Sequence, residues 1–214
     1  MKYRVCCLIV GFVGCAAAAD TWTVDVNGGG DYETIQAAID ASSDGDEIQV
    51  MPGTYISPIN YVIDTLGKAI WVHSTEGSGV TIIDGLQLSG GIWCASGEGV
   101  ETIIEGFTIE YCSAARGAGL YCEGSSPTVK DCYFKFNISE EWGGGAYCFD
   151  GSNPIFDSCT FENNQASNGA GVGIRDSGVT LLDCLFNQNS ATAGGGAVRL
   201  NDTNIVVVSR CNFI

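Results

Sequence analysis

The sequence predicts an all-β protein, a right-handed parallel β-helix in which three short strands form each turn of a solenoid. Its 30 glycines against only 4 prolines are typical of a turn-rich β architecture. From Gly117 onward the chain repeats every 25 to 27 residues, and a fixed period of this length indicates a solenoid. Within each repeat, apolar residues alternate in short bursts separated by Gly, Ser and Asn, which is the pattern of strands and turns.

The composition argues against several classes of protein. The 214 residues include 25 Asp and Glu against 9 Lys and Arg, which gives a formal charge of −16. Because neutralising phosphates requires clustered cations, no nucleic-acid partner is expected. With 45% hydrophobic and 16% charged residues, general disorder is not expected either. No apolar run of about 18 residues follows the N-terminal segment, so we expect no transmembrane helix in the mature chain.

Residues 1–19 have the pattern of a signal peptide. A short basic start and an apolar segment over residues 5–13 precede the small-residue motif Ala17-Ala18-Ala19. This order predicts cleavage between Ala19 and Asp20. A second interpretation takes Cys15 as a lipidated residue of a bacterial lipoprotein. Under both interpretations we expect a secreted or surface-displayed protein, located in the outer membrane if the source is bacterial.

Residues 20–55 form the predicted N-terminal cap and first turn. Gly28-Gly29-Gly30 predicts a tight turn, and Asp31 is a suitable N-cap for a short helix that ends at Ala41. Residues 47–50 then alternate as a strand. Because a solenoid needs its open hydrophobic end covered, we expect this short amphipathic helix to cap the molecule.

Residues 56–214 carry the repeats, which predict ladders of like residues. Parallel strands of successive turns stack about 4.8 Å apart, so every column of the repeat becomes a row of neighbours. We expect an inward sulfur ladder, an inward phenylalanine ladder, and a turn ladder whose amides bond along the axis. Their members are Cys132, Cys159, Cys184 and Cys211; Phe134, Phe161, Phe186 and Phe213; and Asn137, Asn164 and Asn189.

The cysteines leave two alternatives open. Outside the predicted signal peptide an even number of cysteines occurs, which in an exported protein suggests disulfides. Neighbouring turns would place their Cα atoms within the disulfide range of about 4.4–6.8 Å. Cys122 could therefore bridge to Cys94 or to Cys148, while the ladder that begins at Cys132 could consist of buried thiols.

Two resemblances to known families cover nearly all of the predicted mature chain. The segment DYETIQAAIDASSDGDEIQVMPGTY, residues 31–55, resembles the N-terminal cap of the pectin-lyase-like β-helix superfamily. The later repeats resemble the polymorphic outer-membrane-protein repeats of chlamydial adhesins, which are defined by GGA-(Ile/Leu/Val) and Phe-x-x-Asn. Here those motifs read Gly144-Gly145-Ala146, Gly195-Gly196-Ala197-Val198, Phe134-x-x-Asn137, Phe161-x-x-Asn164 and Phe186-x-x-Asn189.

Both resemblances imply a β-helix, but they imply no single function, because the superfamily includes lyases, hydrolases, adhesins and scaffolds. The chain departs from the adhesin pattern because it ends at Ile214 in the middle of a turn. We therefore expect a β-helix that is truncated at its C-terminus.

Stacked carboxylates are the candidates for catalysis. The resemblance implies that a lyase would hold Ca²⁺ with carboxylates, and that a hydrolase would group acids on one face. The best acidic column is Asp84 and Glu105, followed by Lys130 and Asp157. Such a column could bind Ca²⁺ or present an acid-base pair. A mixed-charge outward face is the interpretation that we prefer, and we expect His73, the only histidine, to be a surface residue at a strand end.

The leading hypothesis is a protein that acts by binding, as an adhesin-like or carbohydrate-contacting scaffold. Its expected partners are extracellular polysaccharides or glycans on host or other cell surfaces. Trp93, Tyr121 and Tyr147 form one column that could stack sugar rings or could instead pack as a ladder. The alternative is a polysaccharide lyase or glycoside hydrolase, pectate-lyase-like or polygalacturonase-like. A third interpretation is a structural spacer within a longer surface protein.

Overall fold

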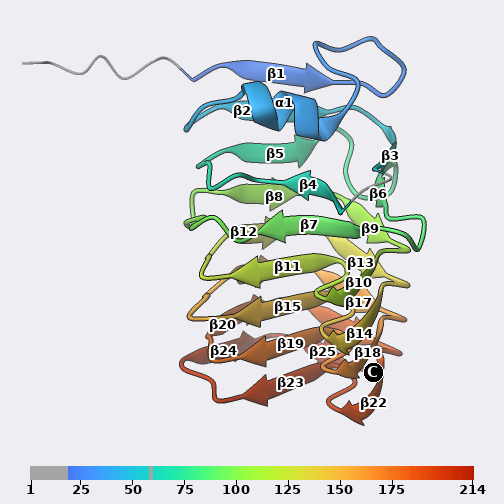
Figure 1. Ribbon diagram of the computed structural model, residues 1–214, viewed down its shortest axis with the longest axis vertical. Coiled ribbons are helices and arrows are strands. Elements are labelled where there is room, and N and C mark those ends of the chain that lie inside the picture. The colour runs from blue at the N-terminus through green and yellow to red at the C-terminus, as the bar shows by residue number, and fades with distance from the viewer. Residues whose placement is uncertain (1–18, 58–59) are drawn as a thin grey trace, which may run out of the picture.

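A computed structural model of the chain describes residues 19–57 and 60–214. The predicted signal peptide therefore lies outside the described residues except for Ala19, as does Cys15. The described chain is an all-β solenoid with one short helix, which confirms the predicted fold class. Figure 1 shows the strands stacked in successive turns along the long axis, with the helix near the N-terminal end.

Parallel strands make up four sheets that run along the solenoid. Sheet A contains β1 (Thr21–Val24), β2 (Glu47–Val50), β5 (Trp71–Ser74), β8 (Ile103–Glu105), β12 (Thr128–Lys130), β16 (Ile155–Asp157), β20 (Val179–Leu182) and β24 (Val206–Ser209). Sheet B contains β3 (Gly53–Ile56), β6 (Thr81–Asp84), β9 (Thr108–Glu110), β13 (Tyr133–Lys135), β17 (Thr160–Glu162), β21 (Leu185–Asn187) and β25 (Asn212–Phe213).

Sheets C and D complete each turn. Sheet C contains β4 (Tyr61–Asp64), β7 (Gly90–Cys94), β11 (Leu120–Glu123), β15 (Ala146–Phe149), β19 (Val172–Arg175) and β23 (Val198–Asn201). Sheet D contains β10 (Ser113–Arg116), β14 (Ile138–Trp142), β18 (Gln165–Asn168) and β22 (Ser190–Gly194).

The number of strands per turn differs from the prediction in the later part of the solenoid. The early turns have three strands, as expected, but from β10 onward each turn has a fourth strand in sheet D. The reason is the length of the connection from sheet B to sheet C. Residues 85–89 join β6 to β7, whereas residues 111–119 join β9 to β11 and have room for an additional strand.

Helix α1 (Ile35–Ala41) caps the solenoid, as its amphipathic pattern predicted, and buries Ile35, Ala38 and Ile39. Its N-cap is Thr34, whose side chain accepts a hydrogen bond from the amide of Ala37. The predicted N-cap was Asp31, but that carboxylate instead accepts hydrogen bonds from the backbone and hydroxyl of Thr23. The N-cap therefore lies three residues later in the chain than predicted.

The C-terminal end of α1 is held by a lysine from the next turn. The ammonium of Lys68 donates hydrogen bonds to the carbonyl oxygens of Ile39, Asp40 and Ser42. These carbonyls would otherwise lack partners, and a cation at a helix C-terminus is favourable. In the described part of the chain, no helix is long and apolar enough to span a membrane.

The core contains stacked columns of side chains. Phe134, Phe161, Phe186 and Phe213 stack with 4.9 Å between neighbouring ring centroids. In the asparagine column, the side-chain nitrogen of Asn137 donates a hydrogen bond to the side-chain oxygen of Asn164 at 3.0 Å. The side-chain nitrogen of Asn164 donates in the same way to Asn189 at 2.9 Å. These ladders fix the register of neighbouring turns and make the solenoid a rigid scaffold.

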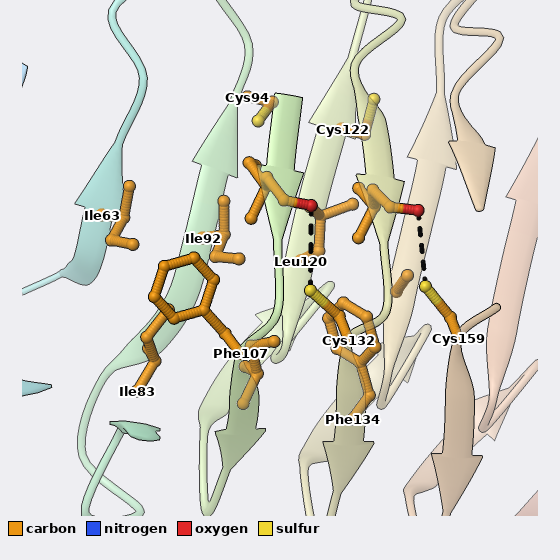
Figure 2. Close-up of a cluster of buried hydrophobic side chains, with 14 of the residues drawn as sticks. Ile63, Ile83, Ile92, Cys94, Phe107, Leu120, Cys122, Cys132, Phe134 and Cys159 are labelled. Carbon is orange, nitrogen blue, oxygen red and sulfur yellow. Dashed lines mark hydrogen bonds between the residues drawn. The ribbon is translucent and has the colours of Figure 1, made fainter. Parts of the chain in front are cut away.

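The cysteines of the core are free thiols in the described chain, at all eight positions from Cys94 to Cys211. Figure 2 shows Cys132 and Cys159 among buried apolar side chains, each thiol directed at a carbonyl oxygen of the preceding turn. Burial raises the pKa of Cys132 to about 12. Burial thus keeps the Cys132 thiol in the protonated, unreactive form.

Candidate functional site

The structure separates the two carboxylates that were predicted as a catalytic pair. Asp84 lies in β6 of sheet B, where its neighbours across the ladder are Ile56 and Glu110. Glu105 lies in β8 of sheet A, between His73 and Lys130. The predicted column was therefore wrong at Asp84.

The error has a physical cause. The segments Ile82-Ile83-Asp84-Gly85 and Ile103-Ile104-Glu105-Gly106 look alike because both are a strand followed by a glycine turn. They nevertheless occupy different sheets, since strand chemistry is the same on every face of a β-helix. Lys130 and Asp157 do follow Glu105 on successive strands of sheet A.

On sheet A, Glu105 belongs to a polar cluster with the only histidine. Its carboxylate accepts a hydrogen bond from the indole nitrogen of Trp71 at 3.0 Å. The Trp71 ring stacks on His73, whose Nε2 lies 2.9 Å from a carboxylate oxygen of Glu47. Hydrogen bonds from Gln49 and His73 lower the pKa of Glu47. This cluster is a network of mutually satisfied surface groups.

No metal centre is evident in the described chain. Across residues 19–57 and 60–214, no group of three or more His, Cys, Asp or Glu side chains is arranged to hold a metal ion. Binding of Ca²⁺ therefore stays a prediction from the family resemblance.

The aromatic column forms, but most of it is packed rather than open. Trp93, Tyr121 and Tyr147 are register neighbours in sheet C, with ring centroids 4.4 Å and 5.9 Å apart. Tyr121 is 8% exposed and Tyr147 is fully buried, because Trp142 and Phe149 pack against the Tyr147 ring. Tyr121 and Tyr147 therefore cannot stack a sugar ring, which corrects that expectation.

Trp93, at the N-terminal end of the column, is half-buried and faces a cleft of about 660 Å³. The cleft lies on the outer side of β4, beside the beginning of α1, and its volume is within the range of small-molecule sites. It is lined by Thr34, Gln36, Ile56, Ser57, Asn60, Tyr61, Val62, Asp64 and Trp93. Aromatic, apolar and polar side chains thus meet in one hollow.

The aromatic wall of the cleft is held in place from two sides. The ring of Tyr61 packs against Trp93 with 4.9 Å between centroids, tilted by 57°, and its hydroxyl donates to the carbonyl oxygen of Arg116. Gly90 makes this position available, because a Cβ at Gly90 would lie 2.2 Å from the Tyr61 ring. The smallest residue is therefore required opposite the tyrosine.

The polar wall is fixed by contacts between α1 and β4. The amide oxygen of Gln36 accepts from the backbone of Asp64 at 2.7 Å, and its nitrogen donates to the Asp64 carbonyl at 3.1 Å and to the Asp40 carboxylate at 2.9 Å. One carboxylate oxygen of Asp64 accepts from the amide of Leu66 at 2.9 Å. The cleft is therefore largely pre-formed.

Sequence reasoning identified Trp93 but missed Tyr61, Gln36 and Asp64. Asp64 is the register neighbour of Trp93 in the preceding turn, so a correct alignment of that turn would have placed it in the aromatic column. Gln36 had no comparable signal, since its role depends on where the capping helix meets the solenoid.

A buried carboxylate was also missed. Glu98 is 2% exposed and accepts hydrogen bonds from the hydroxyls of Thr65 and Ser125 at 2.6 Å and 2.7 Å, and from the backbone of Gly67 and Ser96. Burial raises the pKa of Glu98, but these hydrogen bonds outweigh it and the net shift is downward. Glu98 thus joins three successive turns and has a structural role.

Comparisons with known proteins bear on the fold. A family model described as "Right handed beta helix region" matches residues 60–214. No curated protein matches the chain. Among solved structures, a pectin methylesterase from carrot aligns at 11% sequence identity with a TM-score of 0.46, over 92% of this chain and 84% of that chain.

Proposed function

The chain belongs to the right-handed β-helix family, and from this premise we propose that it is an exported or surface-displayed protein that binds a saccharide in the cleft beside α1. The observation that carries the proposal is the pair of aromatic rings, Tyr61 and Trp93, in a pre-formed hollow with fixed polar groups. Sugars present C–H groups on one face and hydroxyls at their edges, so they suit a site that is aromatic on one side and polar on another.

Each wall of the cleft has a part in this binding. The indole of Trp93 is half-buried, because one face is stacked on Tyr121 and Tyr61 also packs against the ring. The part of the indole that these two rings leave uncovered offers an apolar surface to a pyranose ring. The side chains of Asn60 and Asp64 offer hydrogen-bonding groups to hydroxyls, and Gln36 holds the position of Asp64. Because Trp93, Gln36 and Asp64 are held by other residues before a ligand arrives, binding does not have to order them.

The rest of the solenoid supports a binding role. Its buried ladders make a stiff scaffold, which suits the adhesin-like or carbohydrate-contacting function that the repeats suggested. The enzymatic alternative is a polysaccharide lyase or glycoside hydrolase, for which the resemblance of the cap and the acidic columns spoke, with Asp84 and Glu105 as the candidate acids. These carboxylates lie on different sheets, so the binding function is the better supported of the two.

Titration calorimetry with neutral oligosaccharides tests the proposal. We expect saturable binding of at least one member of a panel of gluco-, xylo- and N-acetylglucosamine hexamers. Trp93→Ala should weaken that binding by about tenfold, because the stacking surface is lost. Trp71→Ala is the matched control, since Trp71 is exposed on sheet A, away from the cleft, and it should change affinity less than about twofold. Equal losses in both variants would contradict the proposal.

A further inference from the structure

We infer that the cleft prefers saccharides that carry an ammonium group, such as oligomers of glucosamine. This inference rests on the proposed saccharide binding and adds the charge of the ligand. It follows from the charge of the cleft lining, in which Asp64 is the one charged residue among those that the structure describes.

Among the residues that line the cleft in the described chain, Asp64 is the only one with a charged side chain. One of its oxygens accepts the Leu66 amide, while the other has no hydrogen-bond partner among the described residues. Asp64 and Trp93 are register neighbours on adjacent strands, so their Cα atoms lie about one strand spacing apart and their side chains leave the sheet on the same face.

An ammonium group is the ligand group that both of these residues attract. A carboxylate forms its strongest hydrogen bonds with cationic donors. The part of the Trp93 indole that Tyr61 and Tyr121 leave uncovered attracts a cation through the quadrupole of the ring. A neutral hydroxyl would use the same oxygen but would gain less from it. The position next to Trp93 therefore discriminates in favour of an amino sugar.

The charges near the cleft and on the whole chain also favour a cationic ligand. A second carboxylate, that of Asp40, accepts from Gln36 at the edge of the cleft. Lys68, four residues after Asp64, has its ammonium directed to the carbonyl oxygens at the end of α1. The formal charge of the whole chain is −16. A polymer of uronic acids would be repelled by this field, whereas a cationic polymer would be attracted to it.

The test compares hexamers of glucosamine and of N-acetylglucosamine, which differ in charge but share one backbone, near pH 6 at low salt. We expect the charged hexamer to bind about tenfold more tightly, with the preference reduced at high salt. Asp64→Asn should remove it, because asparagine still accepts the Leu66 amide but carries no charge. Asp84→Asn on sheet B is the matched control and should leave the preference unchanged.

The outcomes separate this inference from the proposed function. Equal binding of both hexamers, with no effect of Asp64→Asn, would overturn the charge preference and leave saccharide binding intact. Loss of affinity for both hexamers in Trp93→Ala, together with loss of the preference alone in Asp64→Asn, would support both. Binding of neither hexamer would overturn the charge preference.

A separate observation concerns the predicted cleavage before Asp20. Asp46 is 5% exposed, and one of its carboxylate oxygens accepts the backbone N–H of Asp20 at 2.8 Å. The other oxygen accepts from the indole nitrogen of Trp22 and from the amide of Ser43. A nearly buried carboxylate thus lies at the atom that cleavage would convert into an ammonium group.

We propose that processing at this bond stabilises the fold through an ion pair. Hydrolysis of the Ala19–Asp20 peptide bond consumes one water, leaves a carboxylate on Ala19, and frees an amine on Asp20 that is protonated near neutral pH. This ammonium replaces a neutral amide donor opposite Asp46, and a charge-assisted hydrogen bond is the stronger of the two.

Two chains that differ by one residue test this second inference. The chain that begins at Asp20 should melt about 2–4 °C above the chain that begins at Ala19, in which the same nitrogen is still an amide. Asp46→Asn should abolish the difference between the two chains. Equal melting temperatures in the unsubstituted pair, or a difference that persists in Asp46→Asn, would overturn the inference.

Discussion

The asparagine ladder allows a sharp test of what holds the turns together, through the substitution Asn164→Ala. The Asn164 side chain is fully buried and takes part in four hydrogen bonds. Its oxygen accepts from the backbone and the amide of Asn137, at 3.1 Å and 3.0 Å. Its nitrogen donates to the Phe134 carbonyl and to Asn189, both at 2.9 Å.

The expected cost follows from this arrangement. Each hydrogen bond contributes about 1 kcal/mol net, and partners left buried without a replacement cost more, so we expect a loss of about 3–5 kcal/mol in the free energy of unfolding. For a chain of this length that corresponds to a fall of about 10 °C in Tm. Urea unfolding followed by circular dichroism measures the loss directly.

Asn189→Ala is the control, because it lies in the same column but is only partly buried. Water can replace part of what that side chain provides, so we expect a loss of about 1–2 kcal/mol. If Asn164→Ala costs less than about 1 kcal/mol, or no more than Asn189→Ala, the amide ladder does not stabilise the stacking of turns.

Three further predictions follow from buried or bridging groups. Glu98→Gln should reduce the loss of melting temperature at acid pH. Because the pKa of Glu98 is lowered in the folded state, the carboxylate stabilises the fold above the unfolded pKa of about 4.3, and this stabilisation is lost as pH falls through the folded pKa. Melting scans from pH 3 to 7 would show the difference. Lys68→Met should cost about 1–2 kcal/mol through the end of α1, whereas Lys130→Met on sheet A should cost less, as measured by urea unfolding. The buried thiols should react with a thiol reagent only on unfolding, apart from the partly exposed Cys211. After denaturation without reductant, mass spectrometry should find all eight of these cysteines alkylated, and a smaller number would refute the prediction.

The columns that the sequence could predict are those with a strong repeat. Phe134 and Asn137 recur in later turns with a constant spacing, and the physics of parallel stacking then places each residue on its counterpart. Trp93 was identified for the same reason. These features are local in sequence and are repeated, so no knowledge of the tertiary structure was needed.

The remaining features depended on information that is not periodic. Asp84 was placed on the wrong sheet because the early turns differ in length, and a strand followed by glycine looks the same on each face. The burial of Tyr147 depends on Trp142, which lies in an additional strand that the expected three-strand turn did not include. Gln36 and Asp64 meet only because α1 packs across β4, and such a contact between distant segments has no signature in the sequence.

The most direct test of the central claim follows the indole N–H resonances of the four tryptophans in a ¹H–¹⁵N NMR titration with the tightest-binding oligosaccharide. Each resonance is assigned by single substitution. Our account predicts that the Trp93 resonance shifts saturably, while the resonances of Trp22, Trp71 and Trp142 do not follow it. A saturable shift of Trp71 or Trp142 without one of Trp93 would place the ligand elsewhere on the solenoid and contradict the account.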